Sequence, residues 1–260
     1  MHKASEEVQR PCILIFGDSG IGKTTLACST SEVPEMSPVL YLNLEDGALS
    51  IKELYPDITI INIETLRQLQ SVFDDLYRKD GAGFKTVIVD NATEEQKIGL
   101  EHFFNKASSG PATDFVDFKS GSYQDQSWSW SSEQMRKSVR YFRRLPMNVI
   151  FTAWAKDFAK PNDSKPKIRP AFTPQVANEI PGLFQDIYYY YMKGNKRLLQ
   201  TVTTDTCIAK DRTRKLPPLL EDPTMKEIWE YWNGIQIYTP PAPKEEDKKP
   251  SVQRPNNVRK

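Results

Sequence analysis

The stretch Gly17-Asp18-Ser19-Gly20-Ile21-Gly22-Lys23-Thr24 matches the pattern G-x-x-x-x-G-K-T at every position. Glycines at this spacing let the backbone curl so that successive N–H groups point inward and form a cradle for phosphate. The Lys23 ammonium can reach the β- and γ-phosphates of a nucleotide, and the Thr24 hydroxyl can ligate Mg²⁺. We therefore predict that a nucleoside triphosphate is bound by Gly17, Asp18, Ser19, Gly20, Ile21, Gly22, Lys23, Thr24 and Thr25.

The segments on either side of this loop favour the same interpretation. Residues 12–16 read CILIF, a short apolar run typical of a buried strand, and residues 24–28 read as the first turns of a helix. A helix that begins at the loop directs its positive N-terminal end at the phosphates. A chance glycine-rich turn would not be expected to have both a buried strand before it and a helix after it.

Composition excludes several other classes of protein. Lys and Arg number 35 against 34 Asp and Glu, for a net charge of +1, so any nucleic-acid surface must be local. The three cysteines form no C-x-x-C pair and there are only two histidines, which argues against a disulfide framework, a zinc site or histidine chemistry. No signal peptide or apolar run of membrane length is present, so we expect a soluble cytoplasmic protein with no membrane partner.

Strand-like and helix-like segments alternate along most of the chain. Strands are predicted over 12–16, 39–45, 58–61, 86–90 and 148–153, and helices over 24–28, 48–55, 65–79, 94–106, 133–145 and 225–232. Continuous apolar strands alternating with helices predict an α/β fold, with a mostly parallel central sheet covered by helices on both faces. Three later strand candidates, 186–192, 197–203 and 206–209, lie close together and predict a C-terminal antiparallel β extension.

This pattern also divides the chain. We expect a flexible N-terminus over residues 1–10, a nucleotide-binding core over 11–236, and a disordered, basic, Pro-rich tail over 237–260. Residues 107–131 are polar and without a clear period, which predicts a long functional or mobile loop.

Three residues beyond the cradle are candidates for nucleotide chemistry. Asp90 ends the apolar strand 86–90 and is predicted to hold Mg²⁺ together with Thr24. Glu45 ends the predicted strand 39–45, where a carboxylate can activate the attacking water. Asp46 is the fallback, and a helix N-cap is the structural alternative. Thr152 closes the strand 148–152, where a hydroxyl can sense the γ-phosphate.

Lys210 and Arg212 lie two residues apart after an apolar β-segment, so an extended chain places them on one side. Two cations aimed together suit a polyphosphate and can stabilise transition-state charge from a neighbouring subunit. A solvated basic turn is an equal alternative on the residues alone.

The order of these elements, from Gly17–Thr24 through Leu42–Gly47, Val87–Asp90 and Val149–Thr152 to Lys210–Arg212, resembles a RecA-type ATPase core. It is similar above all to compact phage nucleotide-binding proteins with AAA domains, including phage RecA-like single-strand-annealing recombinases. The resemblance covers about residues 11–220. It implies that Glu45 is the catalytic glutamate and that Lys210 and Arg212 match the Lys-x-Arg pair by which RadA and DnaB-like hexameric ATPases reach the next subunit's nucleotide.

The resemblance also implies ATP and Mg²⁺ as cofactors and, if the chain is phage-encoded, the host cytoplasm as its location. One departure is Ala153-Trp154, where RecA proteins often carry a polar Gln or His. This departure bears on phosphate sensing and on its coupling to DNA.

Two basic segments are candidate DNA contacts. The helix 133–145 gathers arginines on one face, and the segment 156–170 has a net charge of +3 and follows the sensor-like strand. The predicted DNA-binding residues are Arg136, Arg140, Arg143, Arg144, Lys160, Lys165, Lys167 and Arg169. Trp128 and Trp130 either stack on bases or fix their segment to the core.

These observations predict an ATP-hydrolysing protein that acts on single-stranded DNA in phage recombination, strand annealing or replication. It would assemble with itself as a ring or filament, with ATP between subunits, and a single-strand-binding protein is a further candidate partner. A nucleotide-gated loader or scaffold with weak turnover and a small-molecule P-loop kinase are the alternatives. A GTPase is disfavoured because Asn105-Lys106 is not followed by the Asp that reads guanine.

Overall fold

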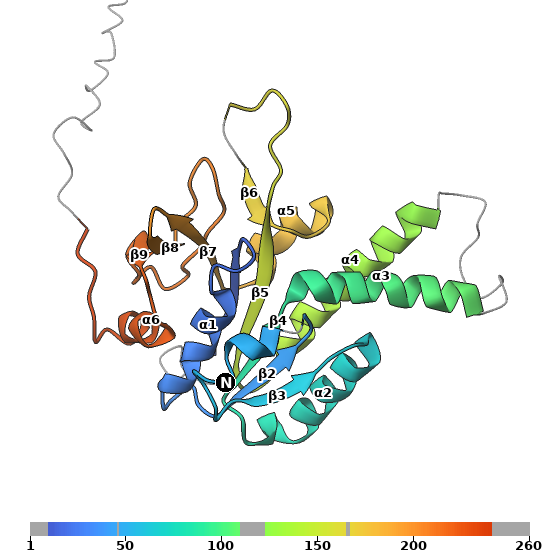
Figure 1. The fold of residues 1–260 in the computed structure, drawn as a ribbon, viewed down its shortest axis with the longest axis horizontal. Coiled ribbons are helices and arrows are strands. Elements are labelled where there is room, and N and C mark those ends of the chain that lie inside the picture. The colour runs from blue at the N-terminus through green and yellow to red at the C-terminus, as the bar shows by residue number, and fades with distance from the viewer. Residues whose placement is uncertain (1–9, 46, 110–122, 165–166, 241–260) are drawn as a thin grey trace, which may run out of the picture.

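The computed structural model describes residues 10–45, 47–109, 123–164 and 167–240, and its strands form one sheet (Figure 1). The strand order is β3-β2-β4-β5-β1-β7-β8-β9, with β6 paired to the end of β5. The strands are β1 (Cys12–Gly17), β2 (Val39–Asn43), β3 (Thr59–Asn62), β4 (Thr86–Asp90), β5 (Asn148–Asp157), β6 (Ile168–Pro170), β7 (Asp186–Lys193), β8 (Lys196–Gln200) and β9 (Leu219–Glu221). Pairing is parallel from β3 to β7 and antiparallel from β7 to β9, which confirms the predicted fold class.

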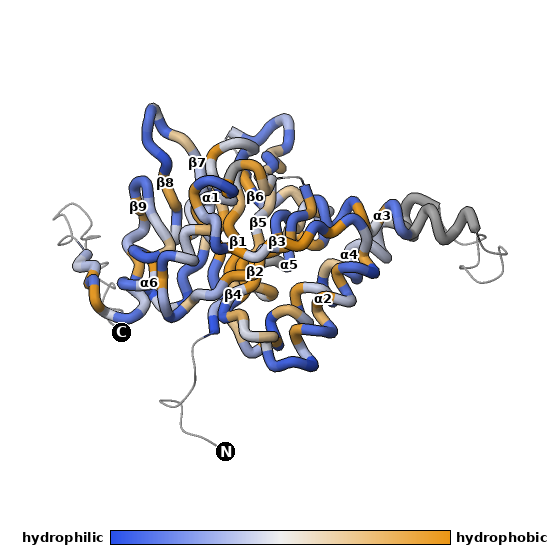
Figure 2. Tube along the Cα trace, turned by 60° about the horizontal axis from the view of Figure 1, so that its bottom comes forward, coloured by the Kyte–Doolittle hydropathy of each residue, from blue (hydrophilic) through white to orange (hydrophobic). Residues whose placement is uncertain are grey.

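Helices cover both faces of this sheet. They are α1 (Lys23–Cys28), α2 (Leu66–Arg78), α3 (Ala92–Ser109), α4 (Tyr123–Phe142), α5 (Pro174–Leu183) and α6 (Met225–Trp232), with 3-10 turns η2 (Ser29–Glu32), η3 (Gly47–Ser50) and η4 (Asp80–Gly83). Alternate residues of β1 enter two separate cores: Leu14 packs with side chains of α2, α4 and α5, and Ile15 packs with those of α1 and α6. The central strands are the most hydrophobic part of the trace in Figure 2, because both of their faces are buried.

The register of the parallel strands brings their carboxyl ends to one edge. Gly17 lies beside Trp154, and Asn43 lies beside Asp90. The four strands that carry the predicted site, β2, β4, β5 and β1, are consecutive neighbours in the sheet. Residues that follow these strands therefore share a single edge, where ligands bind in open α/β sheets.

The predicted loop over 107–131 is wrong over the residues that can be described there. Helix α3 runs to Ser109 and α4 begins at Tyr123, so 123–131 are helical. At the end of this stretch a small polar residue, Ser131, makes the close contact between α3 and α4. The buried Ser131 hydroxyl donates to the Gln96 carbonyl at 3.1 Å and lies opposite Gly99.

Other boundaries also differ from the sequence predictions. Strand β5 continues to Asp157 and pairs with β6, so the predicted loop 156–170 is a hairpin that projects from the sheet in Figure 1. The helix expected over 48–55 is only the short turn η3. In place of a strand over 206–209 there are two isolated bridges, Ile168 to Cys207 and Ile187 to Lys210.

The predicted N-terminal and C-terminal flexible segments lie outside the described residues, except for residues 10 and 237–240. Within the part of the chain that the structure describes, no helix is both long enough and apolar enough to cross a membrane.

Candidate active site

The glycine loop joins β1 to α1 at the carboxyl edge of the sheet. Gly17 has no room for a side chain, because a Cβ there would lie 2.0 Å from the Tyr190 carbonyl oxygen of β7. Gly22 caps α1 with a positive φ of 99°, a conformation that favours glycine. The Lys23 ammonium donates to the carbonyls of Gly17 at 3.1 Å and Asp18 at 2.7 Å. Burial lowers the pKa of Lys23, and the negative charges of Asp90 and Glu45 offset part of this decrease.

Asp90 is the centre of a network of hydroxyl groups. Its Oδ2 accepts hydrogen bonds from Thr24 Oγ1 and from the Tyr41 hydroxyl, each at 2.6 Å, and its Oδ1 accepts one from Thr152 Oγ1. The carboxylate is almost completely buried, and such a charge is tolerated only when its oxygens are hydrogen-bonded. Burial and the adjacent Asp90 charge raise the pKa of Tyr41, which therefore remains a donor.

The residues present fit a magnesium ion. Thr24 and Asp90 supply a hydroxyl and a carboxylate oxygen, hard ligands of the kind that Mg²⁺ takes alongside water and phosphate oxygens. Gly47 leaves space beside them, since a Cβ there would lie 3.2 Å from the Tyr41 hydroxyl and 3.6 Å from Asp90 Oδ2. No group of three or more His, Cys, Asp or Glu gathers elsewhere among the described residues as an alternative metal site.

Glu45 lies two residues beyond β2, beside the same edge. Its side chain is half-buried, and its Oε2 has no hydrogen-bond partner among the described residues. Burial and then the Asp90 charge raise the pKa of Glu45, while Lys23 and the Trp154 indole offset part of the rise. A carboxylate with a raised pKa and an unpaired oxygen suits a general base. The fallback residue, Asp46, lies outside the described residues.

Thr152, the predicted phosphate sensor, is fully buried and directs its hydroxyl at Asp90. Two residues further along β5, Trp154 lies where the resemblance leads one to expect a polar side chain. Its backbone N–H donates to Thr93 Oγ1 at 3.0 Å. In this structure the Thr152 hydroxyl therefore holds the Asp90 carboxylate in place.

Sequence reasoning missed Arg197 on β8. The Arg197 Nε donates to the Ile21 carbonyl of the glycine loop at 2.9 Å. A cavity of about 210 Å³ adjoins this contact along one face of α1, lined by Gly22, Thr25, Leu26, Ser29, Tyr55, Tyr190, Arg197, Asp222, Pro223 and Thr224. The antiparallel extension therefore helps to build the nucleotide edge, which no local motif indicates.

Lys210 and Arg212 are not brought to their own chain's cradle. Lys210 pairs with Ile187 near the start of β7, and its ammonium donates to the Phe184 carbonyl at 2.8 Å. Burial and then Arg212 lower the pKa of Lys210. The Arg212 backbone N–H donates to Asp186 at 2.7 Å, whereas its side chain is exposed. Arg212 is thus the more accessible of the two cations.

The predicted DNA contacts fall into two places. On α4, Arg136 is held by Glu179 at 2.5 and 3.0 Å and by Glu133 at 3.3 Å, which leaves it little capacity for a phosphate. Arg140, Arg143 and Arg144 are exposed, although Arg143 also donates to the Leu183 carbonyl.

The other place is the β5–β6 hairpin. Lys160 and Lys167 are exposed there, and Lys167 pairs with Asp163 at 3.1 Å. Arg169 donates to Asn178, and Lys165 lies outside the described residues.

Strand β5 lies between the strand that carries the glycine loop and the strand that ends in Asp90. This strand order, together with the glycine loop and Asp90 at the carboxyl edge of the sheet, defines the chain as a P-loop ATPase of the RecA-like type. More particularly, it belongs to the AAA domain family, which matches residues 9–213.

Two solved structures illustrate what the fold is similar to. The RadB recombinase is 13% identical, with a TM-score of 0.45 over 81% of this chain and 86% of that one. A prototypical ATPase from the type III secretion system of pathogenic bacteria is 14% identical, with a TM-score of 0.43 over 69% of this chain and 50% of that one. Among curated protein sequences, none matches the chain.

Proposed function

We propose that this protein hydrolyses ATP with Mg²⁺, that single-stranded DNA stimulates the reaction, and that two copies of the chain complete each site. The observation that carries the proposal is the arrangement around Asp90, in which the loop residue Thr24 and the acid of β4 meet at 2.6 Å with Glu45 nearby. Phage recombination, annealing or replication is the setting that the resemblance supports.

In this proposal each residue at the edge has a distinct task. Lys23 leaves the loop carbonyls to contact the β- and γ-phosphates, and Glu45 accepts a proton from the attacking water. Thr24 and Asp90 would hold Mg²⁺, which when bound neutralises charge on the phosphate oxygens. The cavity beside Arg197 offers a place for the nucleoside.

A second copy of the chain would supply the remaining positive charge. Arg212 is exposed and lies away from its own cradle, which suits a residue that acts on a neighbour's nucleotide. Lys210 is anchored on Phe184 and would orient this segment. The site would then form only when subunits assemble, as a ring or a filament.

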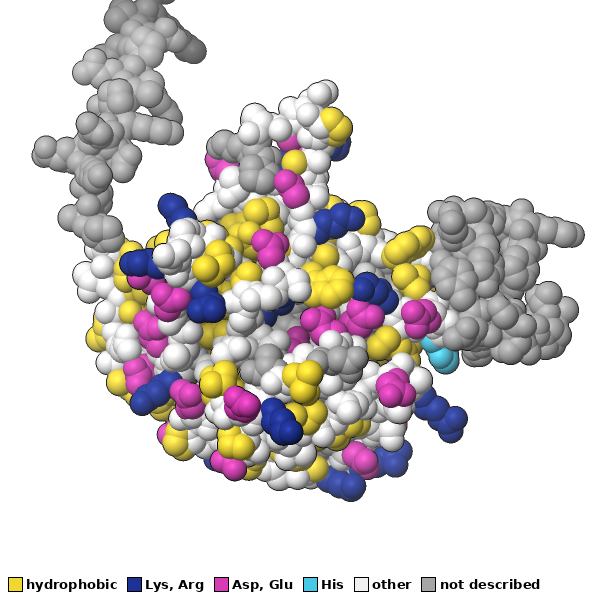
Figure 3. Space-filling model, in the orientation of Figure 1, with side chains coloured by type: hydrophobic (Ala, Val, Ile, Leu, Met, Phe, Trp, Pro, Cys, Tyr) yellow, Lys and Arg dark blue, Asp and Glu magenta, His cyan; other side chains and the backbone are white. Residues whose placement is uncertain are grey.

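The DNA surface in this proposal is local. Basic and acidic side chains are mixed over the face in Figure 3, as expected for a net charge of +1. The candidate phosphate contacts are the exposed lysines Lys160 and Lys167 on the projecting hairpin, the exposed Arg140 on α4 and the exposed Arg144 in the turn after it. Arg136 leaves this set because Glu133 and Glu179 both bind it and its side chain is only 12% exposed. Lys167 stays in the set because, among the described residues, it pairs with Asp163 alone and its side chain is 46% exposed.

One observation favours the loader or scaffold with weak turnover. The Thr152 hydroxyl is bound to Asp90, and the next residue of β5 on the same face is Trp154 rather than a polar sensor. Weak coupling between DNA and hydrolysis would be the signature of this second function.

The test measures ATP hydrolysis with and without single-stranded DNA, together with the solution mass with ATP present. We expect DNA to raise the rate and ATP to raise the mass, and Lys23→Ala to remove both responses. If DNA changes neither rate nor mass while ATP is hydrolysed, the recombinase-type function is wrong and the loader remains. No hydrolysis under any condition would overturn the ATPase.

A further inference from the structure

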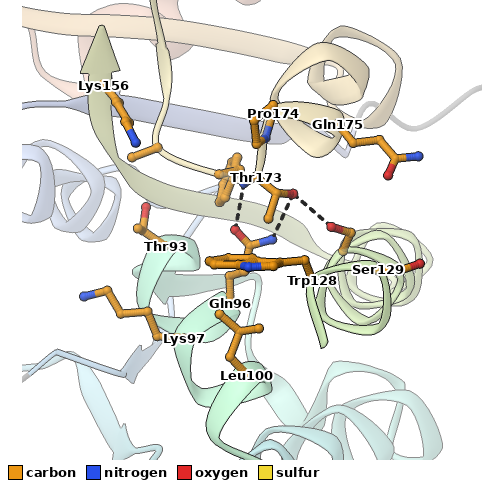
Figure 4. A pocket seen from close by; sticks show the side chains of 13 residues that line it. Thr93, Gln96, Lys97, Leu100, Trp128, Ser129, Lys156, Thr173, Pro174 and Gln175 are labelled. Atoms are coloured by element: carbon orange, nitrogen blue, oxygen red, sulfur yellow. Dashed lines mark hydrogen bonds between the residues drawn. The ribbon is translucent and has the colours of Figure 1, made fainter. Parts of the chain in front are cut away.

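A second and larger cavity, of about 700 Å³, lies beyond the nucleotide edge (Figure 4). It is bounded by α3, α4, the end of β5 and the segment 171–175. Its volume falls within the range of pockets that hold small molecules. None of the residues assigned above to ATP or Mg²⁺ lines it, so the proposed hydrolysis does not account for it.

The wall of this cavity has a distinctive chemistry. Figure 4 shows Lys156 extending from β5 and Lys97 from α3, with the Trp128 ring of α4 between the helices and the segment around Thr173. The Trp128 side chain is 49% exposed, which is high for an indole. No acidic residue is among the thirteen that line the cavity.

The floor of the cavity is rigid, because its polar groups bind one another. Thr173 N–H donates to Gln96 Oε1 at 3.0 Å, and the Thr173 and Ser132 hydroxyls lie 2.9 Å apart. Leu100 and Phe172 add apolar surface. The cavity thus combines a preformed floor, an exposed aromatic face and two cations. This combination suits a flat, uncharged base whose backbone has a phosphate on either side.

We propose that this cavity binds an unstacked base of single-stranded DNA on the Trp128 ring, with the flanking phosphates at Lys97 and Lys156. The inference rests on the proposed function, since it identifies where the single strand enters. Charge complementarity selects the occupant: a strand with a phosphate at each nucleotide suits a cavity whose described lining residues include two lysines and no acid.

The cavity also has a physical connection to the hydrolytic site. The Lys97 ammonium lies 4.1 Å from the centre of the Trp154 ring and pairs with Glu94 at 2.7 Å. Trp154 in turn contacts Thr93, which lines the cavity, and influences the carboxyl group of Glu45. A phosphate that draws Lys97 toward the cavity would release Trp154 and so change the surroundings of Glu45.

The binding experiment uses the full chain and a fluorescent oligothymidylate, with anisotropy as the readout. Trp128→Ala should weaken binding by between about five- and 150-fold, the range for loss of one stacked base. Trp128→Phe keeps a stacking face and should bind nearly as tightly as the wild type. An oligomer with abasic sugars should bind both variants equally, because no base is present to stack.

The lysines have their own readout. The double variant Lys97→Ala/Lys156→Ala should reduce the slope of log K against log salt by about 1.4, as expected for two lost phosphate contacts on a single strand. Lys79→Ala is the matched control, because Lys79 is exposed and pairs with Asp75 on α2 away from the cavity. Melting temperatures close to that of the wild type would show that each variant is folded.

Three outcomes would overturn the inference. If the wild type binds DNA but Trp128→Ala and the double lysine variant bind it equally well, the strand enters elsewhere and the proposed function stands. If an acidic peptide but no oligonucleotide binds in a Trp128-dependent way, the occupant is a protein segment. If the wild type binds no single strand at all, the proposed function fails together with this site.

Discussion

Thr24 Oγ1 donates a 2.6 Å hydrogen bond to Asp90 Oδ2, which joins the first turn of α1 to the end of β4 across 66 positions of sequence. The Tyr41 hydroxyl shares the same acceptor oxygen at the same distance. These contacts place the two proposed magnesium ligands, Thr24 and Asp90, next to each other, so the proposed site is preorganised.

Thr24→Ala should therefore raise the Mg²⁺ concentration for half-maximal hydrolysis by at least about tenfold, roughly 1.4 kcal/mol, because one ligand and its link to Asp90 are lost. Thr24→Ser retains the hydroxyl and is the matched control. A magnesium titration of ATP hydrolysis at fixed ATP measures the shift. Equal curves for the alanine and serine variants would rule out Thr24 as a ligand.

Glu45→Gln should lower hydrolysis by on the order of 100-fold or more while ATP still binds, since an amide cannot accept the proton of the attacking water. The rate of the wild type should also fall as the pH decreases through the raised pKa of Glu45, because the protonated form is inactive as a base. The measurements are single-turnover hydrolysis from pH 5 to 8 and binding of a fluorescent ATP analogue.

Trp154→Phe provides the control for this assignment. The Trp154 indole lowers the pKa of Glu45, so its removal should move the acid limb of the profile to higher pH. If the pH–rate profile of Glu45→Gln has the same acid limb as that of the wild type, another group is the base.

Arg212→Ala should reduce hydrolysis by on the order of 10³-fold, as is typical when a transition-state arginine is lost. Because Arg212 is exposed and far from its own cradle, it should act on a neighbour. A mixture of Arg212→Ala with Lys23→Ala should then recover a measurable fraction of activity, since one subunit has an intact cradle and the other an intact arginine.

Lys215→Ala, a change at a cation close by in the sequence, is the control for a general loss of charge. Its ammonium donates to the Trp232 carbonyl at 2.5 Å within the same chain. A mixture as inactive as its parents would remove support for action between subunits.

The cradle, Asp90 and Glu45 could be predicted because each is set by a local rule. A glycine motif specifies the loop, and residues at the carboxyl ends of neighbouring parallel strands must share an edge. Tyr41 and Arg197 could not be predicted in this way. Tyr41 is one aromatic among several in buried strands, and Arg197 reaches Ile21 only through the antiparallel pairing of β8 with β7.

The arginines of α4 show a second limit. Their spacing on one helical face resembles a phosphate-binding surface, but Arg136 is bound by Glu179 of α5, a helix that the sequence analysis did not predict. Whether a surface cation is available depends on its partners in space, and periodicity along one helix carries no information about them.

Glu95 offers a test of stability that is independent of ATP. This residue of α3 is 3% exposed, its Oε2 has no hydrogen-bond partner among the described residues, and burial raises its pKa to about 7, with Ser138 offsetting part of the rise. Because the folded-state pKa lies above the unfolded value of about 4.5, this group favours the folded state at low pH. That contribution is lost as the pH rises through about 7, which amounts to on the order of 3 kcal/mol by pH 8.

Glu95→Gln should therefore raise the melting temperature at pH 8 by several degrees, since the amide has the same shape and no charge to desolvate. At pH 4 the carboxyl is largely neutral in both the folded and the unfolded state, so the two proteins should melt within about a degree of each other. Glu101→Gln, on the exposed side of the same helix, should change neither value. Scanning calorimetry at the two pH values measures the difference, and a Glu95→Gln protein that is no more stable at pH 8 would mean that Glu95 is solvated or paired in solution.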